Sequence, residues 1–377
     1  MEKLINNNFV IRQFEESDLP AFKELIKTSW NENHVLLKSE SLMLWQYQGF
    51  GKNAGMHFPT LFDKDGRMIG FRGVFPVEVN VPTKDGLITT TMAVGSLYLV
   101  IPEFRGQKLG LALQQFTQEC YGNYMAIGSN LGTSAPIYKK SGYLMIDQMR
   151  RYLAPFNDEY KYLLIDPNET YKKNIWQCGE DAKIEARLSS KELAVIWLKS
   201  PLSKMLSINK SESYWEWRYL KHPIYKYFMF GGFDDGGVVV GRICHFYNDS
   251  GIISKTSLFR ILEIIPTEEA VSSQICSQKL SDLICGVLSW AKSIGCAGVE
   301  AYLTTNVFDT LLKKCGMSLN TENNSLNIIS NYEPMTSSPK LTNVSIYLGE
   351  DNVVKSFDSI YMSLADSDQD RPNIVHL

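Results

Sequence analysis

The sequence predicts an α/β (α+β) fold made of two successive halves, each a mixed twisted sheet flanked by helices. Two observations carry this prediction. In both halves, short apolar runs with the alternation of strands lie between segments whose apolar residues recur at helical spacing. The same order of elements also returns about 170 residues later, and such an internal repeat indicates duplication of a structural unit.

The composition excludes several classes of protein. A length of 377 residues, a hydrophobic fraction of 44% and a formal net charge of −3 are typical of a globular protein with two domains, and they give no reason to expect nucleic-acid binding. No apolar run is long enough to span a bilayer, and the N-terminus lacks the apolar core of a signal peptide, so we expect a cytoplasmic protein without membrane insertion. The seven cysteines and five histidines are scattered, which predicts reduced thiols and no metal site.

Local patterns predict the elements of the first half in order. A strand over 9–14 precedes a helix that we expect Ser17 and Asp18 to cap, and a second helical region covers 42–47. Glycine-bearing turns then predict two hairpins. The hairpin strands are 60–62 with 68–74, then 75–81 with 87–92, and the half ends with a strand at 125–128 and a short helix at 135–141.

Between these elements lies the stretch that we expect to bind a ligand. An apolar strand ends at Pro102, and Arg105 and Gly106 then open a helix whose apolar face begins at Leu109. A helix that starts after such a turn leaves backbone N–H groups unpaired, and these groups form an anion site together with the positive end of the helix dipole. Gly106 and Gly110 let a phosphate approach the backbone because they carry no Cβ.

Two motifs resemble a known family. The pattern Pro-Glu-Phe-Arg-Gly-x-x-Leu-Gly-x-x-Leu over 102–113 resembles the acyl-CoA pyrophosphate loop of the GNAT superfamily of N-acyltransferases. The sequence Tyr-Lys-Lys-Ser-Gly-Tyr at 138–143 resembles the superfamily's Tyr-x-x-x-Gly-aromatic element. The first pattern departs from the family at one position, since the family usually has glycine where Lys108 stands. The resemblance implies acyl-CoA as co-substrate, bound by these residues: Tyr98, Leu99, Val100, Arg105, Gly106, Gln107, Lys108, Leu109, Gly110 and Leu111.

The resemblance also suggests catalytic groups. Tyr138 resembles the family's general acid by position and would protonate the departing thiolate; the alternative is that Tyr138 is only a packing aromatic. A backbone N–H near Val100 is the natural oxyanion donor, where the family's strands splay apart. For the general base, His57, His34 and Glu78 are available. We favour deprotonation through water, since an amine beside hydroxyl groups is less basic than a lysine.

The acceptor site is expected to include four residues of the first half: Arg72, Ser96, His57 and Asn130. Arg72 could hold an acidic group such as a phosphate, or it could equally be an arginine at the surface or at a sheet edge. Ser96 lies on the strand where GNAT enzymes often place a carboxylate. The tryptophans Trp45, Trp215 and Trp217 are predicted to lie in helix cores rather than to form a stacking platform.

The second half repeats the first without its ligand-binding motifs. Trp217 and the two residues after it correspond to Trp45-Gln46-Tyr47, and Ile264-Ile265-Pro266 corresponds to Val100-Ile101-Pro102. Glu268 and Glu269 follow where the first half has its glycine loop, and two carboxylates at that place repel a pyrophosphate. Leu312 stands in the place of Tyr138.

We therefore expect a catalytic domain with the acyl-CoA loop over 1–156, a linker over 157–183, and a degenerate domain over 184–377. The degenerate domain is expected to lack a CoA loop and to form the acceptor cleft. The acidic run at 366–370 is expected to be a solvated tail.

As a whole, the chain resembles tandem GNAT proteins of bacterial surface-polysaccharide (O-antigen, lipopolysaccharide) pathways. The resemblance implies an N-acyltransferase that uses acetyl- or hydroxybutyryl-CoA and acylates the amine of a nucleotide-linked amino sugar, such as a dTDP-3-amino-3,6-dideoxyhexose, in a ternary complex. The chain is expected to be a monomer or a homodimer. Two alternatives remain open: a Fem-like aminoacyltransferase of cell-wall precursors, and a non-catalytic CoA-binding scaffold. The CoA loop speaks against the first, and turnover with any amino sugar would exclude the second.

Overall fold

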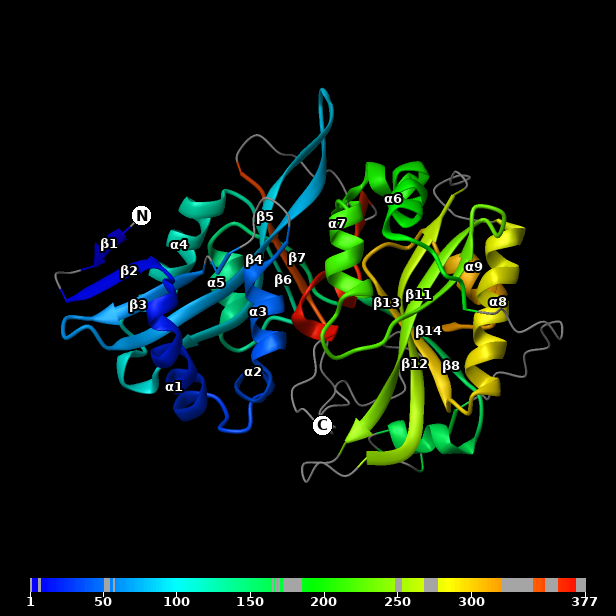
Figure 1. Ribbon diagram of the computed structural model, residues 1–377, viewed down its shortest axis with the longest axis horizontal. Helices are drawn as coiled ribbons and strands as arrows, with labels where there is room; N and C mark the ends of the chain where they lie inside the picture. Colours follow the sequence, from blue (N-terminus) through cyan, green and yellow to red (C-terminus); the bar gives the residue numbers. More distant parts are fainter. Residues whose placement is uncertain are drawn as a thin grey trace.

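The structure is a computed structural model that describes residues 2–5, 8–50, 55–56, 58–164, 166, 168, 170–171, 185–247, 253–267, 277–320, 342–349 and 359–370. Within these residues, two twisted sheets lie side by side along the longest axis of the molecule (Figure 1).

The first sheet is the larger one. Its described strands run in the order β1 (Glu2–Ile5), β2 (Phe9–Gln13), β3 (Pro59–Asp63), β4 (Met68–Thr83), β5 (Gly86–Val100), β6 (Tyr124–Ile127), β15 (Val344–Tyr347) and β7 (Leu144–Ile146). Beside β4 lies β9 (Leu206–Ile208), which also pairs with β16 (Ile360–Tyr361). The order of the second sheet is β10 (Phe228–Gly232), β11 (Gly237–Tyr247), β12 (Ile253–Pro266), β13 (Gly298–Leu303), β8 (Arg150–Pro155) and β14 (Ser318–Asn320).

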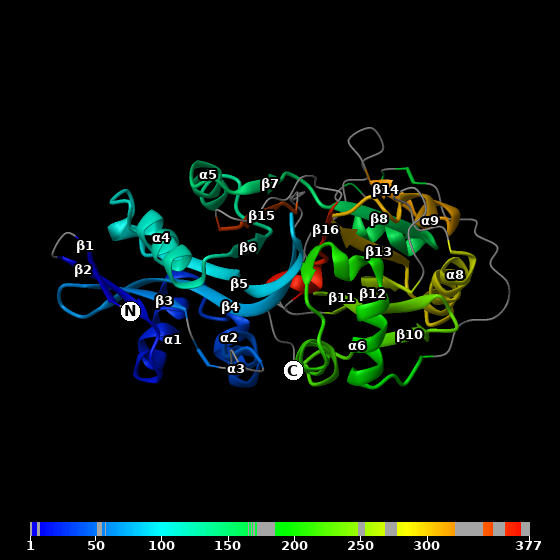
Figure 2. The ribbon, with the colours of Figure 1, turned by 90° about the horizontal axis from the view of Figure 1, so that it is seen from above.

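Helices cover these sheets. The α-helices of the described residues are α1 (Leu19–Ser29), α2 (Val35–Lys38), α3 (Glu40–Gln48), α4 (Leu109–Tyr121), α5 (Ser134–Lys140), α6 (Ser190–Lys199), α7 (Glu212–Trp215), α8 (Gln278–Ser293) and α9 (Asp309–Lys314). In Figure 2, α1, α2 and α3 lie on one face of the first sheet, and α4 and α5 lie on the other. In the second half, α6 packs on β11 and β12, and α8 packs on β10, β11 and β13.

The predicted fold class is confirmed, and three local predictions are wrong in detail. β4 and β5 are single long strands, because their ladder runs from Gly86 at the turn to Val100 and is interrupted only by one bulge, between Arg72 and Val74. Asp18 occupies the N-cap position of α1, but its Oδ2 accepts from Nη1 of Arg12 at 2.7 Å and not from a helix N–H. Helix α4 begins at Leu109 rather than at Arg105 and Gly106, since the residues between form a loop.

The two sheets exchange a strand. β8 precedes the second half in sequence, yet it lies antiparallel between β13 and β14 of the second sheet. Reciprocally, β15 lies antiparallel between β6 and β7 of the first sheet. The exchange crosses the limit that we expected at residue 156, and the expected linker contains a 3-10 helix, η4 (Asp158–Leu163). Each sheet therefore needs a strand from the other half of the sequence.

A reciprocal contact marks where the halves meet. The indole rings of Trp45 and Trp217 stack with centroids 4.9 Å apart and an interplanar angle of 16°. Nε1 of Trp45 donates to the carbonyl of Trp217 at 2.7 Å, and Nε1 of Trp217 donates to the carbonyl of Trp45 at 2.9 Å. Contacts that repeat in both directions are the signature of a twofold axis. The prediction that Trp215 and Trp217 lie in a core is confirmed, since both are buried.

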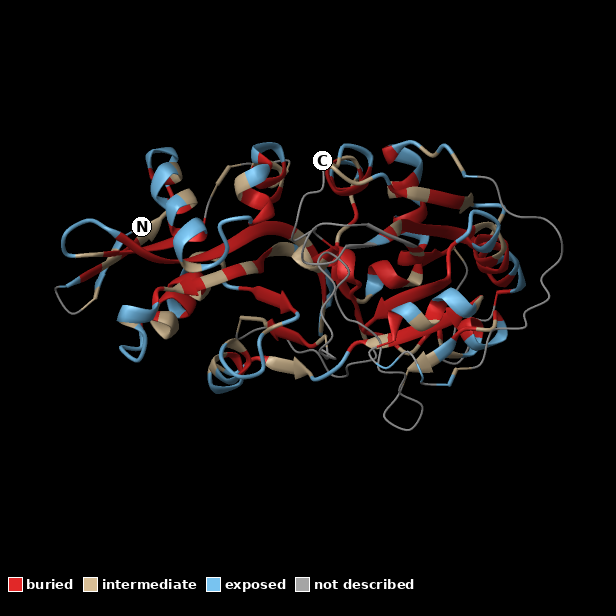
Figure 3. Cartoon of the chain, turned by 90° about the horizontal axis from the view of Figure 1, so that it is seen from below, coloured by how far each residue is buried: buried red, intermediate tan, exposed pale blue. Residues whose placement is uncertain are grey.

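The buried apolar side chains continue from one half to the other. The largest cluster joins Val77 and Val79 of β4 to Ile208 of β9, Trp197 of α6 and the apolar face of the second sheet. In Figure 3 the buried segments run through both sheets and through the junction. The described cysteines are free thiols, and all except Cys120 are buried, as predicted. Within the described ranges, none of the helices has both the length and the apolar character needed to cross a bilayer.

Candidate active site

The first sheet opens between its two central strands. β5 pairs in parallel with β6 at Ala93 and Val94 and then leaves it, while a bulge at Gly73 interrupts the β4–β5 ladder on the other side. Bulges bend strands and are common beside active sites. The result is a gap along β5 from Gly95 to Val100.

A cavity of about 1580 Å³ fills this gap and continues toward the second half. Its walls include residues 95–100 of β5, the loop before α4, and residues 126–134 after β6. The second half contributes Arg242, Arg260 and Tyr302 from its sheet. Leu364, Asp368 and Gln369 come from the segment 359–370 near the end of the chain. A ligand in this cavity would touch both halves.

Most of the residues expected at the site lie on the wall of this one cavity. They are Arg72, Ser96, Tyr98, Leu99, Val100, Arg105, Gly106, Lys108, Leu109, Gly110, Leu111, Asn130 and Tyr138. Gln107 is exposed in the same loop but does not line the cavity, and His57 lies outside the described residues. His34 is buried at the start of α2, where its Nδ1 accepts from the N–H of Leu36 at 3.2 Å, and neither it nor Glu78 lines the cavity.

The loop before α4 contains two residues with positive φ. After the 3-10 turn η3 (Pro102–Phe104), Nε of Arg105 donates to the carbonyl of Val100 at 3.0 Å, and Gly106 takes a positive φ of 83°. Lys108 has a φ of 61°, which makes it the one non-glycine residue in the left-handed region among the described residues. This conformation explains why the family favours glycine there, since a side chain costs roughly 1–2 kcal/mol.

Gly110 lies where α4 comes closest to β5. The Tyr98 hydroxyl donates to the carbonyl of Gly110, and a Cβ on Gly110 would lie 2.9 Å from that hydroxyl. A side chain at Gly110 would therefore require either Tyr98 or the first turn of α4 to shift.

Arg72 forms the floor of the gap. It is 1% exposed on β4, so the reading of Arg72 as a surface or sheet-edge residue is wrong. Its guanidinium carbon lies 4.3 Å from the ring centroid of Tyr98, 4.7 Å from that of Tyr124 and 5.3 Å from that of Tyr138. Among the described residues no carboxylate pairs with Arg72, and its buried Nε has no hydrogen-bond partner. Cation–π contacts offset only part of the cost of burying such a charge.

Tyr138 lies beside this arginine at the inner end of the cavity. Nη2 of Arg72 donates to the Tyr138 hydroxyl, and the hydroxyl of Tyr124 lies 3.3 Å away. Burial raises the pKa of Tyr138, and the positive charge of Arg72 counteracts part of that rise. The phenol thus stays protonated at neutral pH, while Arg72 is in place to stabilise a phenolate.

In the second half the corresponding gap is filled by the chain itself. The N–H of Ile264, the counterpart of Val100, donates to the Tyr361 hydroxyl at 3.3 Å. That hydroxyl donates to Oε2 of Glu263 at 2.7 Å. On the β13 side, the N–H of Thr304 donates to the carbonyl of Met362 at 3.1 Å. Segment 359–370 therefore spans the ends of β12 and β13.

Charged groups inside the second half are matched to one another. Nζ of Lys210 lies 2.6 Å from Oε1 of Glu263 and 2.9 Å from Oδ1 of Asp366, and all three side chains are fully buried. Burial alone would lower the pKa of Lys210, but Asp366 and Glu263 raise it above its usual value. The expectation of a solvated acidic tail at 366–370 is therefore wrong for Asp366, because its partner is a buried lysine far away in sequence.

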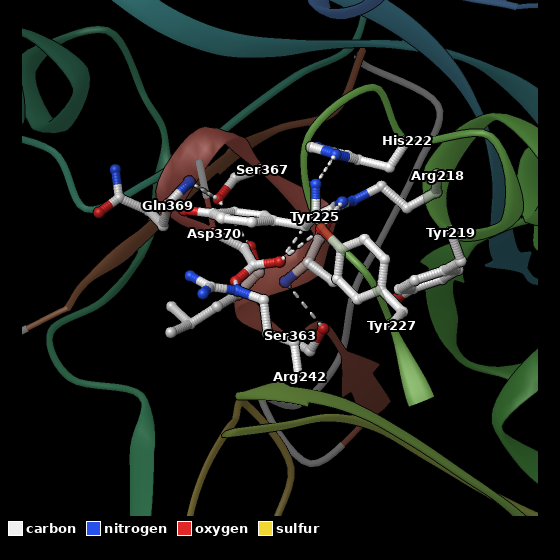
Figure 4. Close-up of polar contacts among 12 residues, drawn as sticks. Arg218, Tyr219, His222, Tyr225, Tyr227, Arg242, Ser363, Ser367, Gln369 and Asp370 are labelled. Atoms are coloured by element: carbon white, nitrogen blue, oxygen red, sulfur yellow. Dashed lines mark hydrogen bonds and ion pairs between the residues drawn. The ribbon is translucent and has the colours of Figure 1, made fainter. Parts of the chain in front are cut away.

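Asp370, at the end of the described segment, is also buried. Its Oδ1 accepts from Nε of Arg242 at 2.6 Å, and its Oδ2 accepts from Nη2 of Arg218 at 3.1 Å and from the Tyr227 hydroxyl at 2.9 Å (Figure 4). Burial acts to raise the pKa of Asp370, but Arg242, Arg218 and Arg260 outweigh it and hold that pKa below its usual value.

Sequence reasoning missed the part of the wall that comes from the second half. The available signal was a lone arginine inside each of two apolar strands, Arg242 in β11 and Arg260 in β12. Glu268 and Glu269, on which the loss of the second loop was argued, lie outside the described residues. Among the described residues, no group of three or more His, Cys, Asp and Glu side chains is arranged to hold a metal ion.

Comparisons with known proteins bear on the fold. No family model and no curated protein sequence matches the chain. Among solved structures, Saccharomyces cerevisiae N-myristoyltransferase with bound myristoyl-CoA is similar over 100% of this chain and 86% of its own, with a TM-score of 0.55 and 9% identity. A GCN5-related N-acetyltransferase from Kribbella flavida is similar over 90% and 72%, with a TM-score of 0.53 and 14% identity. Another from Anabaena variabilis is similar over 83% and 70%, with a TM-score of 0.51 and 10% identity. The chain has a tandem GNAT-like fold.

Proposed function

We propose that this chain is an acyl-CoA-dependent N-acyltransferase whose acceptor is the amine of a nucleotide-linked amino sugar, such as a dTDP-3-amino-3,6-dideoxyhexose. The acyl group would be acetyl or hydroxybutyryl. The observation that carries the proposal is that the anion loop, the open edge of β5 and the Arg72–Tyr138 pair share one cavity. The N-acetyltransferase and N-myristoyltransferase descriptions of the structural neighbours support the class of reaction.

The loop before α4 would hold the pyrophosphate of the acyl-CoA. Its backbone turns through Gly106 and Lys108 with positive φ, and turns with left-handed residues can bring successive N–H groups to one concave side. The start of α4 adds the positive end of its dipole, and the ammonium of Lys108 adds a cation. The co-substrate's arm would then follow the open edge of β5 toward Tyr138.

The backbone N–H of Val100 is our candidate for the oxyanion donor. In the second half the N–H of the corresponding Ile264 donates to a side chain in the gap, so it points away from the strand ladder. By the internal repeat, the Val100 N–H has the same direction and meets the cavity. A fixed donor at this place would stabilise the negative charge that develops on the thioester oxygen during attack.

Tyr138 would supply the proton for the leaving group. The amine nitrogen forms a bond to the thioester carbon, the carbon–sulfur bond breaks, and the thiolate takes the proton of the Tyr138 hydroxyl. Arg72 donates to the oxygen of that hydroxyl, so it would stabilise the phenolate left behind. The proton of the attacking amine passes to water, which reaches the site through the open cavity.

A panel assay tests this function. Purified protein is mixed with several acyl-CoAs and with dTDP-, UDP- and GDP-linked amino sugars, and the release of free thiol is followed. We expect turnover with at least one amino sugar and no turnover with the matching sugars that carry a hydroxyl in place of the amine. Thiol release that is equally fast with and without an amine would contradict the proposal, and binding of CoA without turnover on any acceptor would favour a scaffold.

A further inference from the structure

We propose that the diphosphate of the acceptor binds at a second anion site, formed by Arg242 and Arg260 at the end of the cavity that belongs to the second half. The inference rests on the proposed function and names the part of the degenerate half that recognises the substrate. It assigns a role to two residues that lie far in sequence from the CoA loop.

The two arginines form a pair on the cavity wall. Arg242 on β11 and Arg260 on β12 are direct partners in the antiparallel register, so their side chains leave the same face of the sheet. Each is 4% exposed, and both line the cavity. Like charges placed directly opposite each other destabilise a sheet. The carboxylates of Asp370 and Glu300, which pair with Arg242 and Arg260, offset part of that cost.

The surroundings fix the direction of both guanidiniums. Nε of Arg260 donates to Oε1 of Glu300 at 2.7 Å, and Nη1 of Arg260 lies 3.9 Å from Oδ1 of Asp370. Arg242 also binds Asp370, and its guanidinium carbon lies 3.9 Å from the ring centroid of Tyr225. Figure 4 shows Arg242, Asp370 and Tyr225 close together. Side chains held in this way are preorganised, so binding a ligand costs little further ordering.

The charged groups at this end are of both signs. The cluster contains the guanidiniums of Arg151, Arg218, Arg242 and Arg260, and among the described residues the carboxylates beside them are those of Glu300, Asp368 and Asp370. Asp368 also lines the cavity, so an incoming diphosphate would have to lie on the arginine side of the wall. Guanidinium groups suit phosphate because their donors match two oxygens at once.

The size of the cavity fits two substrates. Its volume of about 1580 Å³ exceeds the roughly 300–1,000 Å³ that is typical of a site for one small molecule. The CoA loop takes one end, and Tyr138 lies where the reacting groups must meet. In a sugar nucleotide the diphosphate is one sugar ring away from the amine, so a second anion site on the opposite wall would hold the sugar toward Tyr138.

Calorimetry with inorganic pyrophosphate tests the site directly. The full chain is first saturated with CoA, so that the loop before α4 is occupied, and pyrophosphate is then titrated. We expect one pyrophosphate per chain for the wild type. Arg242→Gln and Arg260→Gln should each weaken this binding at least tenfold. Arg187→Gln, which removes an exposed arginine of the same half, should leave it unchanged.

Folding and function are controlled separately. Because Arg260 pairs with the buried Glu300, the double variant Arg260→Gln/Glu300→Gln is measured as well, and the CoA affinity of every variant reports an intact first half. Absence of pyrophosphate binding to the CoA-saturated wild type would overturn the inference while leaving the acyltransferase proposal intact. Unchanged pyrophosphate binding in both arginine variants would overturn it too. If the wild type did not bind CoA, that result would instead contradict the proposed function.

Discussion

The two halves share one plan of strands, and they differ in what lies between the central pair. In the first half β5 leaves β6 after Val94, and the gap is a cavity. In the second half β12 and β13 stay paired as far as Ile261, and segment 359–370 spans the strand ends beyond. The same architecture can therefore hold a ligand or hold a piece of its own chain.

The two halves also differ in the partners of their buried cations. The buried cation of the first half, Arg72, has aromatic rings and a phenol beside it but no carboxylate among the described residues. Lys210, one of the buried cations of the second half, has two carboxylates. A buried charge without a carboxylate partner among the described residues, such as that of Arg72, is a candidate for contact with a ligand.

The largest effect should come from removing the phenol of the first half. Tyr138→Phe should lower kcat by roughly 10²- to 10⁴-fold, because no other group replaces its proton, while acyl-CoA affinity stays nearly unchanged. Steady-state kinetics and calorimetry measure the two quantities. Leu312→Met, at the corresponding place in the second half, should leave both unchanged. Wild-type turnover in the Tyr138 variant would reduce this residue to a packing aromatic.

The second half should depend on its lysine for folding rather than for binding. Lys210→Met leaves two buried carboxylates without their cation, and we expect it to lower the free energy of unfolding by about 3–5 kcal/mol. Urea unfolding measures the change, with the exposed Lys204→Met as control. A loss below about 1 kcal/mol would mean that water or protonation compensates the carboxylates.

The third prediction concerns the number of CoA sites. Calorimetry should give one CoA per chain, since the gap of the second half is filled. Gly110→Glu should raise the Kd at least roughly 10²-fold, because its Cβ meets the Tyr98 hydroxyl and its carboxylate faces the phosphate loop. Lys64→Gln makes the same change in net charge on a distant turn and should have no effect. Two equivalent CoA sites would remove the distinction between the halves.

A smaller effect is expected at Lys108. Lys108→Gly relieves the left-handed backbone, which should raise the free energy of unfolding by about 0.5–1 kcal/mol after the larger entropy of glycine in the unfolded chain is counted. The same change removes a cation and should weaken CoA binding several-fold. Lys108→Asn separates the two effects, because asparagine tolerates positive φ without carrying charge. Equal CoA affinity in the wild type and both variants would show that the charge of Lys108 does not contribute to CoA binding.

The last prediction concerns a histidine at the junction of the halves. His222 packs against Trp45, and its Nδ1 accepts from the N–H groups of Ile224 at 3.2 Å and Tyr225 at 2.9 Å. Burial, followed by the charge of Arg218, lowers the pKa of His222 to about 2.

The direction of the pH effect follows from this pKa. The unfolded chain takes up a proton near pH 6.5 and the folded chain does not, so stability is complete above pH 6.5 and is lost as the pH falls below it. Between pH 7 and 5.5 the wild type should lose about 1 kcal/mol more than His222→Asn, measured by urea unfolding at each pH. Identical pH profiles of stability for the wild type and His222→Asn would mean that His222 is protonated as readily in the folded chain as in the unfolded chain.

Some of this arrangement could be predicted from the sequence, because it depends on neighbours along the chain. The turn at Gly86, the glycine-bearing loop before α4 and the short helix with Tyr138 follow from turn chemistry and local spacing. The partners of Asp366 and Asp370 could not be found in that way. The acidic run at 366–370 suggested a solvated segment. Only the fold brings Lys210 to Asp366 and Arg242 to Asp370.

The strand exchange was hidden for the same reason. The local sequences of 150–155 and 344–347 do not indicate which sheet each strand will join. Pairing depends on register with strands far away in the sequence. Arg72 shows the intermediate case. Its residue type suggested anion binding, but its burial under three tyrosines required the structure.

The exchanged strand β15 also determines when the first sheet can be completed during synthesis. When the ribosome has made β6 and β7, the strand that belongs between them is still about 200 residues away, which takes roughly 10–40 seconds at bacterial or eukaryotic elongation rates of about 5–20 residues per second. During that interval β6 is an open sheet edge, and open edges pair readily with other chains. The nascent first half must therefore wait, with β6 exposed, for nearly the whole polypeptide to emerge.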